Sequence, residues 1–197
     1  NFPSFGSTDF VNTFQRVTDG GIVTRSIFSQ LRVDVTPDFQ LIGGLRLEQM
    51  PKYELTMDNA GGTEVHNRVV GYYDRDQVDI LPRFAAMYSI NELNVCKILY
   101  GEAINRPSFF SNVRNISDPF AGQLKPEKIR TIEINYLGTW HHRANVSLSV
   151  FRNSFKDLTV RVVDIDEEFN YRSFFHNAGS LITKGMELTL QLEPASS

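Results

Sequence analysis

Hydrophobic and polar residues alternate with a period of two along most of this chain. In residues 23–35 the odd positions are mainly apolar and the even positions are mainly polar. Because successive side chains of a strand point to opposite faces, this alternation predicts a strand with one apolar and one polar face. A Pro37-Asp38 pair, which is typical of tight turns, separates it from a second alternating stretch at residues 41–48. The two stretches therefore predict an antiparallel hairpin.

Five further stretches repeat the alternation, at residues 80–90, 93–104, 131–140, 144–150 and 182–193. A tight turn at Asn91-Glu92 joins the first two of them, and residues 140–143 join the next two. The pattern predicts seven long strands in all, and it leaves the residues before Gly20 open as an eighth.

The connections between these strands alternate in length. Long polar stretches occupy residues 51–79 and 101–127, and a shorter one occupies 164–169. Short turns at one end of a sheet and long loops at the other are typical of a transmembrane β-barrel. Strands of about 11 to 14 residues also suit a tilted bilayer crossing, which needs ~9–11, whereas soluble strands average ~5–6.

We therefore predict an all-β fold: an antiparallel up-and-down meander of about seven long strands that is part of a large transmembrane β-barrel. A soluble β-sandwich also alternates, with its apolar face turned to a core, and stays the alternative at this point. Strand length and loop asymmetry favour the barrel.

Composition excludes several other classes of protein. The chain has 197 residues, of which 41% are hydrophobic and 22% are charged, so it is not a disordered or low-complexity sequence. Its mean hydropathy is -0.25, and it has no apolar run of the ~18 residues that a membrane-spanning helix needs. A net charge of -3 argues against a nucleic-acid binder. The single cysteine, Cys96, excludes an intrachain disulfide and is expected to be a small apolar filler of a strand.

Two motifs flank the long connection at residues 101–127. They are Tyr100-Gly101 with Arg106-Pro107 on one side and Leu124-Lys125-Pro126-Glu127 on the other. Together with residues 43–47, 150–158 and 177–188, they resemble the barrel of TonB-dependent outer-membrane receptors, in the family's order. The likeness covers residues 29–193, and it departs from the family pattern at Ala121-Gly122, where the family has Asn-Pro.

The resemblance implies an architecture of about 22 strands around a plugged lumen. Residues 1–197 are then expected to be a partial barrel, from the C-terminal half, without the plug domain and without the final strand. Arg106 is expected to face the plug or the lumen, and Pro107 to end the hydrogen-bond ladder of its strand.

The resemblance also implies a function. The intact protein would be an active transporter in the outer membrane of a Gram-negative bacterium. It would take up a scarce nutrient complex, most often a ferric siderophore, energised by the TonB complex, with cobalamin, haem and oligosaccharides left open. No enzymatic step, cofactor or nucleic-acid partner is expected, and outer-membrane lipid is a partner. A passive porin-like barrel and a soluble carbohydrate-binding β-sandwich are the alternatives.

Aromatic residues and arginines gather in the long connection at residues 51–79. In an outer loop of a receptor they suit the capture of anionic or aromatic ligands by stacking and by charge-assisted hydrogen bonds. Tyrosines at this level also form the aromatic girdle of a barrel, which is the alternative. The ligand-binding candidates are Tyr53, His66, Arg68, Tyr72, Tyr73 and Arg75.

No metal site is expected. The side chains of His141 and His142 would point in opposite directions on an extended chain. His66 and His176 are candidates for an iron or haem ligand, but solvated loop histidines are favoured. The acidic run at residues 164–168 is a candidate for Ca²⁺, and a solvated hairpin tip is favoured there.

Overall fold

The seven predicted strands form one antiparallel sheet. The computed structural model describes residues 13–19, 21–61, 64–75, 77–116, 118, 121–140, 143–165 and 171–192, with backbone alone at 13–19, 57–61, 64–69 and 171. The strand order in the sheet is β12-β9-β8-β7-β6-β3-β2. The bounds are β2 Arg25–Thr36, β3 Phe39–Gln49, β6 Val78–Asn91, β7 Asn94–Asn105, β8 Glu127–Trp140, β9 Ala144–Lys156 and β12 Ser180–Leu192. The fold-class prediction is confirmed.

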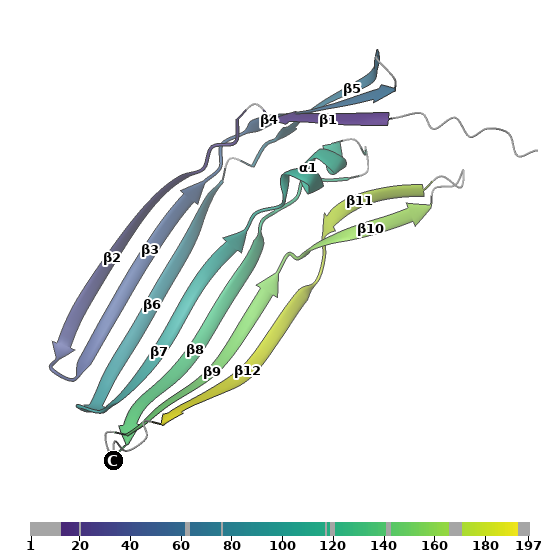
Figure 1. The fold of residues 1–197 in the computed structure, drawn as a ribbon. Helices are drawn as coiled ribbons and strands as arrows, with labels where there is room; N and C mark the ends of the chain where they lie inside the picture. Colours follow the sequence, from purple (N-terminus) through teal and green to yellow (C-terminus); the bar gives the residue numbers. More distant parts are fainter. Residues whose placement is uncertain are drawn as a thin grey trace, which may run out of the picture.

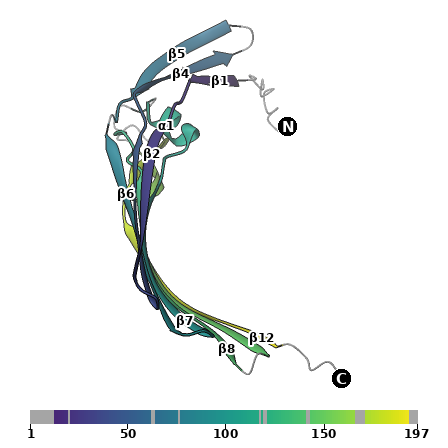
Figure 2. The same ribbon diagram turned by 90° about the vertical axis from the view of Figure 1, so that its left-hand side faces the viewer.

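The sheet is a single curved layer, concave on one side (Figures 1 and 2). The β2–β3, β6–β7 and β8–β9 connections gather at one end of it, and β12 also ends there (Figure 1). The longer connections gather at the opposite end, which we call the outer end. The meander with short turns at one end and long connections at the other is therefore as predicted.

Cross-strand register places the apolar residues on one face of the sheet. Side chains directly opposite each other on paired strands lie on the same face. One row of directly paired residues runs across all seven strands and is apolar throughout: Val33, Leu41, Ala86, Ile98, Ile134, Val150 and Met186. The neighbouring row, on the other face, is mainly polar: Asp34, Gln40, Met87, Lys97, Asn135, Ser149 and Glu187.

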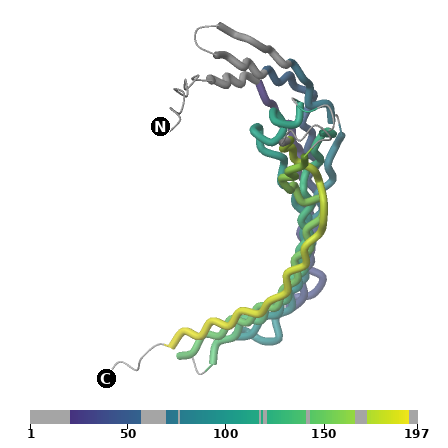
Figure 3. The backbone as a smooth tube through the Cα atoms, turned by 90° about the vertical axis from the view of Figure 1, so that its right-hand side faces the viewer, coloured from purple at the N-terminus to yellow at the C-terminus, as the bar shows by residue number. Residues whose placement is uncertain are grey.

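The apolar face is the convex one. Asp79 and Met87 lie on the same face of β6, and Met87 belongs to the polar row. Asp79 contacts Arg106, which lies in the segment that leads into the helix α1 (Phe109–Ile116). That helix lies on the concave side of the sheet (Figures 2 and 3). Apolar side chains on the convex face stay exposed, for example Met186 at 71% and Ile134 at 53%. A sheet with an apolar convex face and a polar concave face is built for a lipid surround and an aqueous lumen.

The connection at residues 51–79 is not the irregular loop that we predicted. It contains β4 (Tyr53–Gly61) and β5 (Glu64–Tyr73), which form a separate sheet with β1 (Thr13–Asp19) in the order β1-β4-β5. The stretch before Gly20 is thus a strand, but it lies outside the seven-stranded sheet. Alternation failed to show β4 and β5 because polar residues such as Asp58 and Asn59 interrupt it, while ladder pairing needs only the backbone.

Two other predicted connections are also structured. The stretch at residues 101–127 begins with the end of β7 and contains α1, which we did not predict. The acidic run lies at the tip of a hairpin made of β10 (Thr159–Ile165) and β11 (Tyr171–Asn177). The β6–β7 turn falls one residue later than predicted, because Asn91 still pairs with Asn94. Among the described residues, no helix is long and apolar enough to cross a membrane.

The assignment of faces can be tested with two neighbouring residues of β8. Arginine in place of Ile134 should cost about 2–4 kcal/mol of unfolding free energy near the bilayer midplane, because the guanidinium would enter lipid. Arginine in place of Asn135 should cost far less, because that position faces the lumen. Denaturant titration of the intact protein in lipid vesicles measures both. Equal costs for Ile134→Arg and Asn135→Arg would contradict the assignment.

Candidate functional site

The helix α1 is set in place by the residues just before it. Strand β7 ends at Asn105, and Pro107 cannot donate to a ladder, as we predicted for that position. Ser108 then caps the helix, because its Oγ accepts a hydrogen bond from the backbone N of Ser111 at 3.1 Å. The change from strand to helix at the outer end thus follows from two successive residues, Pro107 and Ser108.

The hydrophobic core lies between α1 and the β4–β5 hairpin. Its buried members are Met50, Tyr53, Leu55, Tyr73 and Val113. The rings of Tyr53 and Tyr73 stack with their centroids 5.1 Å apart, and Asn112 of α1 donates a hydrogen bond to the Tyr53 hydroxyl at 3.0 Å. The helix therefore closes over the concave side of the outer end (Figure 3).

Gly71 allows α1 to approach β5 closely. A Cβ atom at this position would lie 2.6 Å from Cγ2 of Ile116. A contact this short would displace the helix or the strand, so glycine is required by packing here.

The seven-stranded sheet opens between β6 and β7 at its outer end. Their pairing runs from Asn91–Asn94 to Arg83–Gly101 and stops there. Pro82, the next residue of β6 toward the outer end, has no N–H to donate. Beyond this point β6 pairs only with β3, and β7 only with β8.

A cluster of carboxylates and guanidinium groups bridges this opening. We call Glu48, Arg75, Asp79 and Arg106 the ionic cluster. Glu48 and Asp79 are direct cross-strand partners, a repulsive arrangement by itself. Arg106 donates hydrogen bonds to both carboxylates, at 3.1 Å and 3.3 Å, and Arg75 contacts Asp79 at 3.2 Å. Arg106 thus joins the end of β7 to β3 and β6, on the concave side.

The second family motif holds the chain on its way back from α1 to β8. Leu124 and Pro126 are buried, and Lys125 is exposed. Asn177 of β11 binds both backbone groups of Lys125: its Nδ2 donates to the carbonyl at 2.9 Å, and its Oδ1 accepts from the amide at 2.6 Å. Glu127 accepts hydrogen bonds from Asn105 and from the backbone of Thr159. In this structure the motif residues hold the outer connections together.

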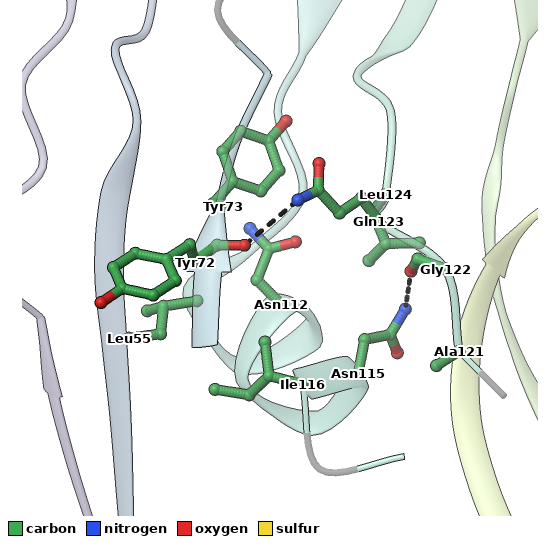
Figure 4. Close-up of a pocket in the computed structure, with 10 residues that line it drawn as sticks. All are labelled: Leu55, Tyr72, Tyr73, Asn112, Asn115, Ile116, Ala121, Gly122, Gln123 and Leu124. Atoms are coloured by element: carbon green, nitrogen blue, oxygen red, sulfur yellow. Dashed lines mark hydrogen bonds between the residues drawn. The ribbon is translucent and has the colours of Figure 1, made fainter. Parts of the chain in front are cut away.

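A small cavity lies between α1, β5 and this returning segment (Figure 4). Its volume is about 60 Å³, and Leu55, Asn112 and Leu124 are among the residues that line it. Gln123 closes one side by donating a hydrogen bond to the Tyr72 carbonyl at 3.1 Å. The cavity has room for only a few water molecules and is too small for a nutrient complex.

Three of the six sequence candidates for ligand binding lie inside this outer layer. Tyr53 and Tyr73 are only 7% and 3% exposed, and the side chain of Arg75 is engaged with Asp79. Burial raises the pKa of Tyr73, and the guanidinium groups of Arg75 and Arg106 oppose that shift. The Tyr73 phenol is therefore neutral at physiological pH.

The other three candidates lie elsewhere on the hairpin. Tyr72 is 49% exposed. Because neighbouring side chains of a strand point to opposite faces and Tyr73 faces α1, Tyr72 lies on the side of β5 away from α1. Lys52 places its ammonium group 4.8 Å from the centroid of the Tyr72 ring. The backbones of His66 and Arg68 lie within β5, and their side chains are outside the described part of the structure.

Sequence analysis missed a partly exposed group of aromatic and arginine residues beside α1. We call Phe110, Arg114, Arg161, Ser173 and Phe175 the Ser173 cluster. Arg114 donates to the backbone carbonyl of Ser173 at 3.2 Å, and Arg161 donates to its hydroxyl at 2.8 Å. The rings of Phe110 and Phe175 pack edge to face with centroids 6.2 Å apart, and Phe110 remains 60% exposed. No single stretch of sequence contains this group, because it joins α1 to the β10–β11 hairpin.

The described residues contain no group of three or more potential metal ligands. His176 is exposed on β11 and has no such group around it. Asp164 pairs loosely with Arg172 at 3.7 Å. His141, His142 and the rest of the acidic run, residues 166–168, lie outside the described residues.

The fold and its outer layer define a class of protein: a segment of a large outer-membrane β-barrel whose outer end is closed over by a helix and hairpins. Residues 1–195 match the family described as "TonB dependent receptor-like, beta-barrel". The chain therefore belongs to the TonB-dependent receptor family, whose members are transport receptors of the Gram-negative outer membrane. The resemblance found in the sequence is confirmed.

Solved structures show the same fold at low sequence identity. The hemophore receptor HasR of Serratia marcescens, in complex with its hemophore HasA and heme, has a TM-score of 0.65 and 18% identity over 87% of this chain and 32% of its own. The ferric yersiniabactin uptake receptor FyuA of Yersinia pestis has a TM-score of 0.64 and 16% identity over 93% of this chain and 26% of its own. The ferric-catecholate import receptor Fiu of E. coli K12 has a TM-score of 0.57 and 18% identity over 86% of this chain and 25% of its own.

The chain thus spans about a quarter to a third of the length of these receptors. No curated protein matches it.

The ionic cluster can be tested through Arg106. Replacing Arg106 by alanine removes the group that Glu48 and Asp79 share and leaves each with one arginine, Arg46 and Arg75. The loss of these part-buried, charge-assisted hydrogen bonds should cost about 1.5–3 kcal/mol of unfolding free energy. Arg46→Ala is a matched control, because Arg46 contacts the same Glu48 but its side chain is 45% exposed, so its loss should cost at most ~1 kcal/mol. Urea titration of the intact protein in detergent measures both.

Neutralising the opposed carboxylates in the same background provides a second check. Glu48→Gln together with Asp79→Asn should recover part of the stability lost in Arg106→Ala, because the repulsion is removed. If Arg106→Ala and Arg46→Ala cost the same, Arg106 does not bridge the opening of the sheet.

Proposed function

We propose that the intact protein is an active outer-membrane transporter that binds a ferric siderophore at its outer end and admits it when energised by TonB. Membership of the receptor family supports transport, and the Ser173 cluster supports this class of cargo. In this proposal, residues 1–197 are a part of the barrel, and a plug domain that contacts TonB and a final strand belong to the same protein.

The Ser173 cluster has the chemistry that an aromatic, anionic ligand requires. Phe110 offers an exposed ring for stacking, worth ~0.5–1.5 kcal/mol beyond buried area. Among the described residues, no ion pair joins Arg114 or Arg161 to a carboxylate, so both guanidinium groups are available to an anion. The helix that carries Phe110 and Arg114 lies on the concave side, where a ligand enters the lumen (Figure 2).

The candidates from the long connection take different parts in this proposal. Tyr53, Tyr73 and Arg75 support the outer layer from inside. Tyr72, with His66 and Arg68 on the same strand, stays a candidate for a second contact, or for the aromatic girdle at the lipid boundary. The two roles of Tyr72 differ in whether its removal changes ligand affinity.

Energised uptake is the first test. Cells that carry the intact receptor are supplied with a radiolabelled ferric catecholate, with and without functional TonB. We expect accumulation to fall at least tenfold when TonB is absent, because a plugged barrel does not let the complex pass. Equal accumulation in both strains would contradict active transport and support the passive porin-like alternative.

Ligand contact is tested by variants of the intact receptor. Phe110→Ala combined with Arg161→Gln should weaken binding of the ferric catecholate at least tenfold, about 1.4 kcal/mol, through loss of stacking and of one charge-assisted hydrogen bond. Trp140→Ala, which removes an exposed ring at the opposite end of the sheet, is the matched control. Heat-modifiable electrophoretic mobility checks that each barrel is folded. Unchanged affinity in the double variant, or an equal loss in Trp140→Ala, would contradict our placement.

A further inference from the structure

The β10–β11 hairpin is a two-stranded sheet, and in the described part of the chain no third strand pairs with either of its edges. It stands at the outer end (Figure 1). Along a strand of an antiparallel pair, residues alternate between those that bond to the neighbouring strand and those whose N–H and C=O groups point away from it. An edge whose outward groups stay unpaired is a template for a further strand.

Side chains of α1 close the outward edge of β11. The Oδ1 atom of Asn115 accepts a hydrogen bond from the backbone amide of Phe175 at 2.8 Å, and its Nδ2 donates to the carbonyl of the same residue at 2.8 Å. Arg114 donates to the backbone carbonyl of Ser173 at 3.2 Å. Phe175 and Ser173 therefore turn their backbone groups away from β10, and the helix occupies the place of a third strand.

The outward edge of β10 is covered at its first residue, because Glu127 accepts a hydrogen bond from the backbone amide of Thr159 at 2.8 Å. Arg161 and Val163 are the direct cross-strand partners of the two β11 residues that α1 holds. Since both residues of such a pair turn their backbone groups away from the partner strand, the N–H and C=O groups of Arg161 and Val163 point outward. Within the described residues, nothing forms a hydrogen bond with these outward groups.

Exposed apolar side chains and an arginine line this open edge. Val163 is 61% exposed and Ile165 is 50% exposed, and both lie on the face of Arg161 because alternate residues of a strand share a face. Among the described residues, no ion pair joins Arg161 to a carboxylate, whereas Asp164 on the opposite face pairs with Arg172 at 3.7 Å. The face that carries Arg161 thus combines apolar surface with one unmatched positive charge.

We propose that the open edge of β10 binds an extended segment of a separate protein by strand addition. The outward groups of Arg161 and Val163 recur every second residue, at ~7 Å, and an extended polypeptide is the ligand whose own N–H and C=O groups have this spacing. Main-chain hydrogen bonds supply the affinity. The segment places a carboxylate opposite Arg161 and apolar residues opposite Val163 and Ile165, and these side chains supply the selectivity.

A second copy of this chain matches the edge poorly. Both partners of an antiparallel edge pairing use their outward residues, which in β10 are the odd-numbered ones. A pairing that covers residues 161–165 of both copies sets Arg161 opposite Ile165, so it brings no carboxylate to the guanidinium group. A separate protein with an acidic residue in its segment satisfies both the backbone groups and the charge.

Hydrogen exchange in the intact receptor, with and without a bound peptide, is the first test. The probe is a synthetic peptide as long as β10, 7 residues, in which threonine and valine alternate around a central glutamate. We expect the Val163 amide to exchange rapidly in the receptor alone and at least tenfold more slowly with the peptide bound. Slow exchange in the receptor alone would show that another part of the same protein covers the edge, and would overturn the proposal, as would failure of the peptide to bind.

Two altered peptides separate the backbone contribution from the charge. N-methylation of the glutamate and of every second residue from it removes the donors that face β10, and should weaken binding at least tenfold in fluorescence anisotropy. Lysine in place of the glutamate should weaken binding at least threefold, because it opposes Arg161. Equal affinity of the N-methylated peptide would rule out strand addition, and equal affinity of the lysine peptide would rule out recognition of an acidic segment.

A proline variant locates the site on the receptor. Val163→Pro removes an outward N–H, and the ladder to β11 tolerates this because it uses the residues on either side. Peptide affinity should fall at least tenfold, and Val163→Thr, which keeps the N–H, is the matched control. Ferric catecholate binding should be unchanged in both variants, which separates this site from the proposed cargo site. Unchanged peptide affinity in Val163→Pro would overturn the assignment. Should that variant fail to fold, the comparison of peptides on the unaltered receptor decides by itself.

Discussion

Backbone hydrogen bonds between neighbouring strands are the interaction on which this structure depends. Hydrocarbon offers no partner to an N–H or C=O group, so a chain that crosses it in strands must pair them continuously. Six antiparallel pairings in the seven-stranded sheet meet this condition and set the register. The register in turn places Ile134 on the convex face and Asn135 on the concave one, and a slip by one residue would exchange them.

The outer end shows what happens where the ladder stops. Beyond Pro82, β6 and β7 no longer pair, and side chains take over from backbone bonds. Arg106 joins Glu48 to Asp79 across the opening, and Asn177 pairs with the backbone of Lys125 as a neighbouring strand would. The family motifs lie at these joints. Their positions are therefore explained by assembly of the outer layer, which carries the proposed ligand contacts.

The proposed cargo-binding surface uses the side of the sheet that α1 covers. The Ser173 cluster lies beside α1 and combines the exposed Phe110 ring with two guanidinium groups. This combination suits a diffusing aromatic anion. The opposite, convex face carries the apolar row, so cargo and membrane lipid meet different faces of one sheet.

The sequence by itself determined the seven strands of the main sheet and their apolar faces, because alternation is a local property of a chain that is half exposed to lipid. It did not show the strands of the outer end, such as β4 and β5. It also carried the family, through motifs such as Arg106-Pro107. The tertiary structure alone decided that Tyr53 and Tyr73 are buried while Phe110 is exposed, and that Arg161 stands opposite Phe175. Those facts depend on contacts between segments distant in the chain, and on strand register, neither of which local alternation encodes.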